Sequence, residues 1–349
     1  MTTYTYATLD PRPTTAAQQA NDAVFAAGPV YGLEVTIQTL ADRCVANLDP
    51  QHLGGDASTA AIEAAVDWPL PPAGATLATV RADADSVGAM AVLLLRSAGY
   101  LLWQGALDRI RVIADADKEA SGSWPGVRPV PAAEALVTPA TPVMSLAADH
   151  RKPLAQRVAL VADWLRGDNE VEALLAEYRE RALMEAQEAL DTLAAQVVDG
   201  VAVISGSHRL AMSIGYRMAP VVVATNPEFR FAGGEPHVKH TVARWASGLP
   251  MDWDGMLAQL RGLEDGWGGS SSICGSPQGA GSKLTTDQVV TIVTRSFKGD
   301  ARMNSSYPET AVCPECAVYN GEDEGGLIDP RLGTYRCIRG HIFTADTDR

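Results

Sequence analysis

The chain is short of basic residues, and this shortage limits its partners. It has 28 lysines and arginines against 42 aspartates and glutamates, which gives a formal net charge of −14. Binding to duplex DNA or to an anionic membrane relies on cationic side chains, so neither is expected as the main partner. A small phosphorylated ligand held through metal ions is compatible with this balance.

Long apolar runs and secretory features are missing as well. No uninterrupted apolar run approaches the roughly 20 residues of a membrane span. The first residues, MTTYTYATLDPRPTT, lack a basic region followed by an apolar one. Five cysteines in 349 residues are too few for a disulfide scaffold. The sequence therefore predicts a cytoplasmic protein without a membrane partner.

The length and a hydrophobic content of 46% are enough for two domains and a small appendage. We expect an α/β fold in which a mostly parallel sheet with flanking helices is followed by a second, smaller α/β domain and a C-terminal zinc ribbon. The expected parts are a first domain at 1–150, a helical connector at 151–200, a second domain at 201–298 and the ribbon at 311–349.

Residues 75–95, ATLATVRADADSVGAMAVLLL, are expected to carry the chemistry. A buried strand gives way to Asp83 and Asp85, and Ser86 is a candidate cap for the helix that follows. In open α/β sheets, ligands bind at the carboxyl ends of strands, and two carboxylates one residue apart can both turn toward one hard cation. The alternative is a helix N-cap with one acidic neighbour.

A second acidic pair follows in residues 109–119, RIRVIADADKE. We interpret it as another strand, ending in Asp115 and Asp117 and joined to the first strand by a helical crossover. Parallel strands of such a βαβ unit bring their carboxyl ends to the same side of the sheet. Four carboxylates in one cleft repel one another, and divalent cations relieve that repulsion. The pattern indicates a cleft in which metal ions could activate water and neutralise a phosphoryl group.

Two aspartate and histidine pairs are candidates to complete this site. Asp49 and His52 lie in a loop rich in glycine and proline, before an alanine-rich helix expected at 57–67. Asp149 and His150 follow a proline-rich connection. The ordinary role of such loop residues is to cap helices and to form turns.

The second half of the chain contains a basic island. Between residues 205 and 245 five lysines and arginines, among them Arg209 and Arg244, occur with two glutamates. A solvated surface is the alternative interpretation. The segment 266–281 is rich in glycine and hydroxyl groups, so its backbone N–H groups could cradle an anion. The substrate-binding residues predicted from these features are Arg209, Arg244, Gly268, Gly269, Ser270 and Gly279.

This half is also expected to alternate strands and helices, after a long helical region with a break near Gly167. The expected strands are 201–205, 220–225 and 238–244, and the expected helices are 154–198, 208–217, 253–263 and 285–297.

The last part of the chain carries the most specific motif. Cys313 and Cys316 form a Cys-x-x-Cys pair, and Cys337 and His341 follow about twenty residues later. Two such ligand pairs are typical of a zinc ribbon with a tetrahedral Cys₃His site. So small a segment has no core of its own, which makes a structural zinc ion the expected source of its stability.

The segment TVRADADSVGA, residues 79–89, resembles the first motif of the DHH phosphoesterase superfamily, metal-dependent enzymes that cleave phosphodiesters, short oligonucleotides or polyphosphates. His240-Thr-Val-Ala-Arg244, the helix expected at 253–263 and the glycine-rich loop are similar to the family's C-terminal substrate domain. The resemblance covers residues 75–297 loosely. The family usually has a histidine four residues before the first aspartate, where this sequence has Thr79, and the chain contains no Asp-His-His triplet.

The resemblance implies a metal-dependent phosphoesterase whose substrate is a small phosphodiester, a nucleotide or a short oligonucleotide. In this hypothesis one or two Mn²⁺ or Mg²⁺ ions are held by Asp83, Asp85 and Asp115, helped by Asp49 and His52 or by Asp149 and His150.

The missing histidine favours an alternative, a degenerate relative that binds a nucleotide without cleaving it and acts as a sensor or adaptor through its ribbon. A nucleic-acid-binding protein led by the ribbon ranks last, because residues 313–349 are not strongly basic. Short single-stranded nucleic acid and a second copy of the chain are compatible partners.

Overall fold

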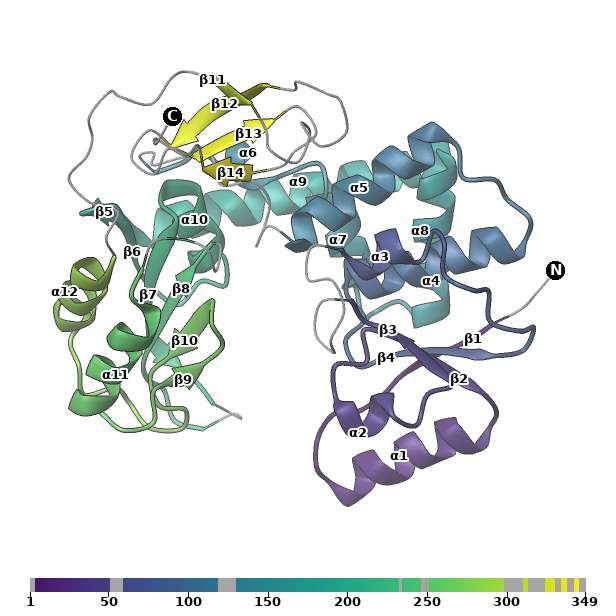
Figure 1. The fold of residues 1–349 in the computed structure, drawn as a ribbon, viewed down its shortest axis with the longest axis horizontal. Helices are drawn as coiled ribbons and strands as arrows, with labels where there is room; N and C mark the ends of the chain where they lie inside the picture. The colour runs from purple at the N-terminus through teal and green to yellow at the C-terminus, as the bar shows by residue number, and fades with distance from the viewer. Residues whose placement is uncertain are drawn as a thin grey trace. The chain divides into compact units, whose positions relative to one another are not determined.

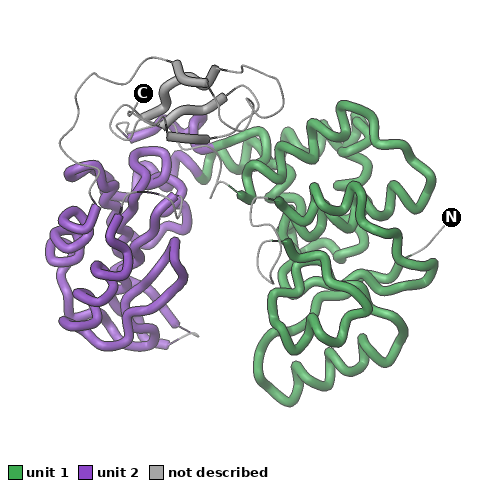
Figure 2. The backbone as a smooth tube through the Cα atoms, in the orientation of Figure 1, with its two compact units in different colours: residues 1–123, 137–185 green, residues 124–136, 186–349 purple. Residues whose placement is uncertain are grey.

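The computed structural model describes residues 4–50, 59–118, 130–231, 234–245, 249 and 251–297, and four strands between 310 and 344 as backbone only. Figure 2 shows the two compact units of the chain, which are 1–123 with 137–185 and 124–136 with 186–349. Each unit combines a sheet with flanking helices, so the predicted α/β class is confirmed. No helix within the described ranges is both long and apolar enough to span a membrane.

Unit 1 is built on a four-stranded sheet of order β1-β4-β2-β3, in which every pairing is parallel. The residues that follow β2, β3 and β4 therefore come out at one edge of the sheet. Glu34 and Asp49 follow β2 and β3 at this edge, and Asp83 lies shortly after β4. The strands are β1 (Thr5–Thr8), β2 (Val30–Leu33), β3 (Ala46–Leu48) and β4 (Thr76–Thr79).

Helices cover both faces of this sheet (Figure 1). Leu33 and Leu77 belong to the core formed with α4, α5, α7 and α8, whereas Val30 and Ala78 pack with α1 and α2. Strands covered on both faces need apolar residues on both, as the parallel sheet requires. The helices are α1 (Thr15–Ala26), α2 (Gln38–Ala41), α3 (Ala61–Ala64), α4 (Ala84–Ser97), α5 (Gln104–Lys118), α7 (Thr141–Ala147), α8 (Leu154–Arg166) and α9 (Asn169–Thr192).

Unit 2 has a mixed six-stranded sheet of order β5-β6-β7-β8-β10-β9. Only β6 and β7 pair in parallel within it. Its strands are β5 (Ala194–Val198), β6 (Val201–Ser205), β7 (Val221–Phe229), β8 (His237–Arg244), β9 (Gly268–Gly269) and β10 (Ile273–Gly275), and its helices are α6 (Ala133–Leu136), α10 (Ala211–Met218), α11 (Trp253–Leu263) and α12 (Thr286–Ser296).

The strands of unit 2 alternate between two cores. Val201, Val203 and Val221 pack with α11 and α12 on one face. Ala202 and Ile204 pack with α10 and the end of α9 on the other. This period of two is what places successive strand residues on opposite faces. The strands and helices expected in this half are confirmed, with ends shifted by a few residues and with the end of the long helical region forming β5 instead.

A third sheet follows near the C-terminus, drawn in yellow in Figure 1. It is an antiparallel meander of order β11-β12-β13-β14. The predicted zinc ligands Cys313, Cys316 and His341 lie outside the described residues, and Cys337, at the end of β13, is described only as backbone. The strands are β11 (Thr310–Val312), β12 (Glu324–Asp329), β13 (Thr334–Cys337) and β14 (Ile342–Thr344).

One expected strand is wrong. Residues 104–118 form helix α5, so the proposed βαβ unit ending in Asp115 and Asp117 does not exist. The buried positions of α5 include Ala106, Ile110 and Ile113, which recur at helical spacing. The parallel neighbours of β4 are β1 and β2 instead.

Candidate functional site

Asp83 begins helix α4 immediately after strand β4. Its Oδ1 accepts a hydrogen bond of 3.2 Å from the backbone N–H of Ser86, and the backbone N–H of Asp83 donates one of 3.2 Å to the Ser86 hydroxyl. In this capping box each side chain satisfies an N–H that the first turn of a helix leaves free. Asp83 rather than Ser86 is therefore the N-cap, so the capping interpretation of the motif holds for its first aspartate.

Asp85 is buried and contacts the start of a different helix. It is 1% exposed, and its two carboxylate oxygens accept hydrogen bonds from the backbone N–H groups of Ala61 and Ile62, the first residues of α3, at 2.7 and 2.8 Å. Burial, with the charge of Asp117, raises the pKa of Asp85 to about 7 in spite of these bonds. Each oxygen keeps a second lone pair, so Asp85 can still bind a cation.

Glu34 is the acidic residue that sequence reasoning missed. It follows β2 at the same sheet edge, is 8% exposed, and has a left-handed backbone with a φ of 54°. Burial raises the pKa of its carboxyl to about 10. The neighbouring charges that add to this rise are those of Asp85, Asp83, Asp117 and Asp49.

Glu34, Asp85 and Asp117 converge from three separate elements. One carboxylate oxygen of each lies within 4.8 Å of the other two. In the part of the chain that the structure describes, this is the one group of three metal-ligand side chains that meet so closely. Such a group is stable either when some of its members hold protons or when a divalent cation neutralises them, and an all-oxygen set suits Mg²⁺, Mn²⁺ or Ca²⁺.

Helix α5 brings Asp117 to this cluster and leaves Asp115 outside it. Residues two apart on a helix do not share a face. The side chain of Asp115 is 53% exposed and lies 3.9 Å from Lys118. Lys118 also contacts Glu63 at 2.9 Å and thereby ties α5 to α3, the helix that Asp85 caps. The structure thus selects the second aspartate of this pair.

Asp49 follows β3 at the same edge as Glu34 and is 7% exposed. Its charge contributes to the raised pKa of Glu34, which places it near the cluster. His52, its predicted companion, lies outside the described residues.

Asp149 is already occupied by partners of its own. Its carboxylate accepts hydrogen bonds from the Arg151 guanidinium at 2.7 and 3.0 Å and from the Tyr178 hydroxyl at 2.7 Å. These bonds hold the pKa of Asp149 well below its ordinary value. The carboxylate therefore serves a local ion pair at the surface of unit 1, and the structure does not join Asp149 or His150 to the cluster of Glu34.

The predicted phosphate-binding residues of unit 2 lie in different settings. Arg209 is exposed in the turn before α10. Arg244 is 8% exposed; its Nε donates to the Ser271 carbonyl at 2.8 Å, and its guanidinium lies 5.0 Å from the centre of the Trp253 ring. Arg244 therefore holds the backbone of the glycine-rich segment at Ser271. Burial lowers its pKa.

Part of the glycine-rich segment is a small hairpin. Gly268 and Gly269 form β9, which pairs with β10, and the Ser270 N–H donates to the Ile273 carbonyl at 2.8 Å. Gly269 needs to be glycine, because a Cβ there would lie 2.0 Å from the Ile273 carbonyl oxygen. Gly279 has a φ of 79°, in the left-handed region.

A buried polar network lies beneath this segment. His240 is fully buried, and its Nε2 lies 2.9 Å from the Leu284 carbonyl, so Nε2 carries the proton. Its Nδ1 then accepts from the Thr225 hydroxyl at 2.9 Å, and burial lowers the pKa of the ring. Glu264 nearby accepts three hydrogen bonds, from Trp267, Ser282 and Lys283. Every member has a partner, so the network is structural.

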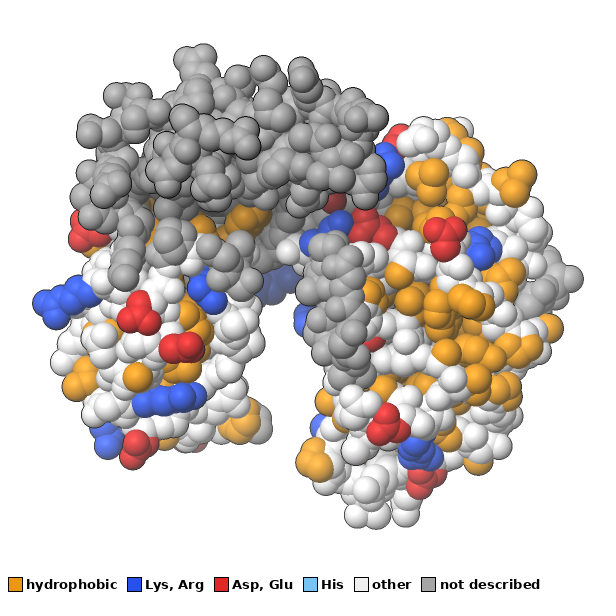
Figure 3. All heavy atoms as spheres, viewed as in Figure 1, with side chains coloured by type: hydrophobic (Ala, Val, Ile, Leu, Met, Phe, Trp, Pro, Cys, Tyr) orange, Lys and Arg blue, Asp and Glu red, His pale blue; other side chains and the backbone are white. Residues whose placement is uncertain are grey.

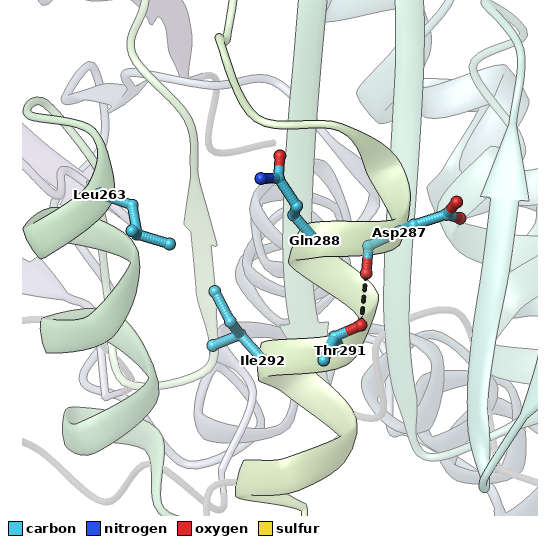
Figure 4. Close-up of a pocket in the computed structure, with 5 residues that line it drawn as sticks. All are labelled: Leu263, Asp287, Gln288, Thr291 and Ile292. Carbon is cyan, nitrogen blue, oxygen red and sulfur yellow. Dashed lines mark hydrogen bonds between the residues drawn. The ribbon is translucent and has the colours of Figure 1, made fainter.

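The described residues have two further surface features, the side chains of one face and a groove. On the face drawn in Figure 3 the visible charged side chains are scattered, whereas hydrophobic ones gather over unit 1. A groove of about 280 Å³ lies between α11 and α12, where Leu263 and Ile292 face each other (Figure 4). None of the predicted site residues lines this groove.

The chain resembles solved structures, but neither family models nor curated proteins match it. A solved structure of a pGpG-specific phosphodiesterase, PggH from Vibrio cholerae, aligns over 85% of this chain and 99% of its own, with a TM-score of 0.37 and 8% identity.

Proposed function

We propose that the protein is a divalent-cation-dependent phosphoesterase that acts on a small phosphodiester, a nucleotide or a short oligonucleotide. The observation that carries this proposal is the convergence of Glu34, Asp85 and Asp117 at the carboxyl edge of a parallel sheet. All the charged groups that shift the pKa of Glu34 are carboxylates, so the site lacks the positive charge that a cation would bring. Carboxyl edges of parallel sheets are where ligands bind in this class of fold.

The residues divide the work between them. Glu34, Asp85 and Asp117 would hold the cation, and Glu34 would give up its proton to do so. A bound cation of this kind neutralises charge on a phosphoryl group and lowers the pKa of water. Asp83 has a side chain that is 34% exposed, and we assign it to orient the attacking water. In unit 2, we assign Arg209 and the segment from Gly268 to Gly279 to the phosphate groups of the substrate, with Arg244 supporting the hairpin.

The test compares two aspartates of one helix. Asp117→Asn should weaken Mn²⁺ binding, measured by calorimetry, and abolish Mn²⁺-dependent hydrolysis, because an amide binds a hard cation poorly. Asp115→Asn is the matched control, with the same change of charge two residues away, and should behave as the wild type. The substrates are an aryl phosphodiester, a cyclic dinucleotide and a short oligonucleotide, each with Mn²⁺ or Mg²⁺. Equal activity of both variants would refute the assignment.

A cation-binding protein without turnover is the second candidate. Thr79 stands where the resembled family has a histidine, and its hydroxyl donates to the Arg81 carbonyl at 3.0 Å within the same turn. The site then has one nitrogen ligand fewer. This sensor or adaptor predicts that Mn²⁺ and a nucleotide bind to the wild type while no substrate of the panel is cleaved.

We further propose a structural zinc ion in the C-terminal segment. Strand β11 ends one residue before Cys313, β13 ends at Cys337, and β14 begins one residue after His341. The register pairs Val312 with Glu324, and Gly325 with Cys337, so these ends share one edge of the meander. This placement supports the Cys₃His spacing as a ligand set.

The zinc proposal predicts about one zinc ion per chain by elemental analysis. Cys316→Ser should release it and lower the stability of the C-terminal segment alone, since metal binding supplies the folding free energy of such small modules. Cys44→Ser, in unit 1, is the control and should retain the metal. Full retention by the first variant would contradict the ligand assignment.

A further inference from the structure

The backbone of Glu34 is unusual for its residue type. Within the described ranges, Glu34 and Asp199 are the residues other than glycine with a positive φ. Asp199 precedes Gly200 in the tight turn between β5 and β6, where aspartate is common. Glutamate has no short polar side chain to support a left-handed conformation. Something outside its own turn must hold Glu34.

Strand β3 supplies the contacts that hold it. The Asn47 amide makes two hydrogen bonds with the backbone of Val35: its Oδ1 accepts from the N–H at 3.2 Å, and its Nδ2 donates to the carbonyl at 3.1 Å. The N–H of Glu34 itself donates to the Leu48 carbonyl at 2.9 Å. The backbone on both sides of Glu34 is therefore fixed to β3.

Gly32 makes room for the two hydrogen bonds between the Asn47 amide and the Val35 backbone, which we call the clamp. Gly32 and Asn47 are direct partners in the register of β2 and β3. A Cβ on Gly32 would lie 2.3 Å from Asn47 Oδ1 and 2.9 Å from Val35 Cγ2, so any larger residue would displace the amide. Gly32 has no positive φ, and its role is the close approach alone.

We propose that Asn47 and Gly32 are positioning residues that hold Glu34 in its left-handed conformation, so that its carboxylate joins Asp85 and Asp117 in the cation site. This inference rests on the cation site proposed above. A residue held in a sparsely populated conformation persists only where its surroundings determine it, and such residues concentrate at functional sites. Asn47 bonds to the backbone of Val35 and is not one of the three clustered carboxylates, so it acts through Glu34.

The chain contains a matched control for this clamp. The Asn21 amide makes the same pair of bonds with the backbone of Asp10, after β1: Asp10 N–H donates to its Oδ1 at 2.9 Å, and its Nδ2 donates to the Asp10 carbonyl at 2.9 Å. Asn21 is 4% exposed and Asp10 is not among the cluster residues. Loss of either asparagine removes equivalent hydrogen bonds, but only Asn47 governs Glu34.

The first experiment measures Mn²⁺ affinity by calorimetry on Asn47→Leu and Asn21→Leu, beside the wild type. Both variants should melt at lower temperature by similar amounts. Only Asn47→Leu should bind Mn²⁺ more weakly, by about 10- to 100-fold, as for other residues that orient metal ligands. Gly32→Ala should reproduce that loss. A folded Asn47→Leu with wild-type affinity would overturn the inference, whereas a wild type that binds no Mn²⁺ would overturn the proposed site itself.

A second measurement does not depend on the metal. Glycine normally stabilises a fold less than alanine does, but at a left-handed position the order reverses. Glu34→Gly should therefore melt above Glu34→Ala in metal-free protein. In chains that also carry Gly32→Ala, which displaces the clamp, this advantage of glycine should shrink or vanish. An unchanged advantage would show that the clamp does not impose the conformation.

Discussion

Glu34 of unit 1 and Glu264 of unit 2 are equally buried, at 8% exposure each, but their carboxylates have opposite surroundings. Glu264 accepts hydrogen bonds from Lys283 N–H at 2.6 Å, from the Ser282 hydroxyl at 2.8 Å and from Trp267 Nε1 at 2.9 Å. Burial alone would raise its pKa, but these bonds and His240 outweigh burial and hold the pKa below its ordinary value. Glu34 meets other carboxylates, and its pKa rises to about 10.

The difference separates a carboxylate whose negative charge the fold stabilises from one whose negative charge the fold disfavours. Donors around Glu264 stabilise its charge at neutral pH, so the group contributes to the folded state. The neighbours of Glu34 penalise its charge, so at neutral pH the metal-free site holds a proton there. Buried carboxylates without compensating donors can bind a cation. Burial alone therefore does not identify a binding residue, and the groups around the carboxylate must be considered too.

The largest expected effect comes from removing the satisfied carboxylate. Glu264→Leu should lower the free energy of unfolding by about 3–5 kcal/mol, because three donors lose their acceptor and at least one of them is buried. Glu34→Gln should leave stability unchanged or raise it, because the amide is neutral already, whereas the Glu34 carboxylate must take up a proton on folding at pH 7. Urea denaturation at pH 7 without metal measures both.

Glu228→Leu, at an exposed position of unit 2, is the control for the change of side chain and should lie within about 0.5 kcal/mol of the wild type. If Glu34→Gln proved as destabilising as Glu264→Leu, the contrast between the two glutamates would fail.

A smaller effect is expected from pH in the absence of metal. An unfolded glutamate loses its proton near pH 4.5, whereas Glu34 in the folded state keeps it to about pH 10. Between these values the folded state binds more protons than the unfolded state, so stability falls as pH rises. Asp85 acts in the same direction between pH 3.8 and about 7.

The free energy of unfolding should therefore be about 1–2 kcal/mol lower at pH 9 than at pH 6. The loss stays this small because the effective dielectric constant around protein charges is high. Glu34→Gln should flatten this dependence, and saturating Mn²⁺ should remove it because the cation displaces the proton. Glu264 predicts the opposite slope, at acid pH only: its contribution is lost as pH falls through its lowered pKa. A wild type whose stability is constant from pH 6 to 9 would contradict the assignment for Glu34.

Local sequence signals predicted only some of the elements that carry the acidic cluster of unit 1. The run from Ala75 to Leu95 gave β4 and α4 correctly, because an apolar strand, an acidic turn and a helix with a cap are all local features. The run from Arg109 to Asp117 was predicted to be a strand because it ends in a second Asp-x-Asp, like the strand before Asp83 and Asp85. Short runs of this kind fit either period, and packing against α3, α4 and α8 selects the helix.

Glu34 lay beyond sequence reasoning for a physical reason. Its role depends on a left-handed φ that Asn47 holds across the sheet and on the distance to Asp85 and Asp117, which are 51 and 83 residues further along the chain. The residues next to Glu34 in the sequence do not indicate either feature. In contrast, the neighbours of Asp83 in the sequence are enough to predict that it lies at a helix N-terminus. The structure shows that it is the N-cap of α4.

Asp83 is the intermediate case, and it predicts the smallest effect. Its Oδ1 accepts a hydrogen bond at the start of α4, as the oxygens of Glu264 do in unit 2. Its charge also contributes to the raised pKa of Glu34. Asp83→Asn keeps the cap, because asparagine is as good an N-cap as aspartate, and should change stability by only a few tenths of a kcal/mol. Asp83→Ala loses the cap and should cost about 1 kcal/mol.

The two Asp83 variants should lose hydrolysis alike in spite of this difference in stability, since neither can orient water with a charged oxygen. Urea denaturation and the aryl phosphodiester assay, run on both, separate the structural role from the chemical one. If Asp83→Asn hydrolysed as fast as the wild type while Asp83→Ala did not, the residue would belong with Glu264 as a structural acceptor. The cation site would then consist of Glu34, Asp85 and Asp117 alone.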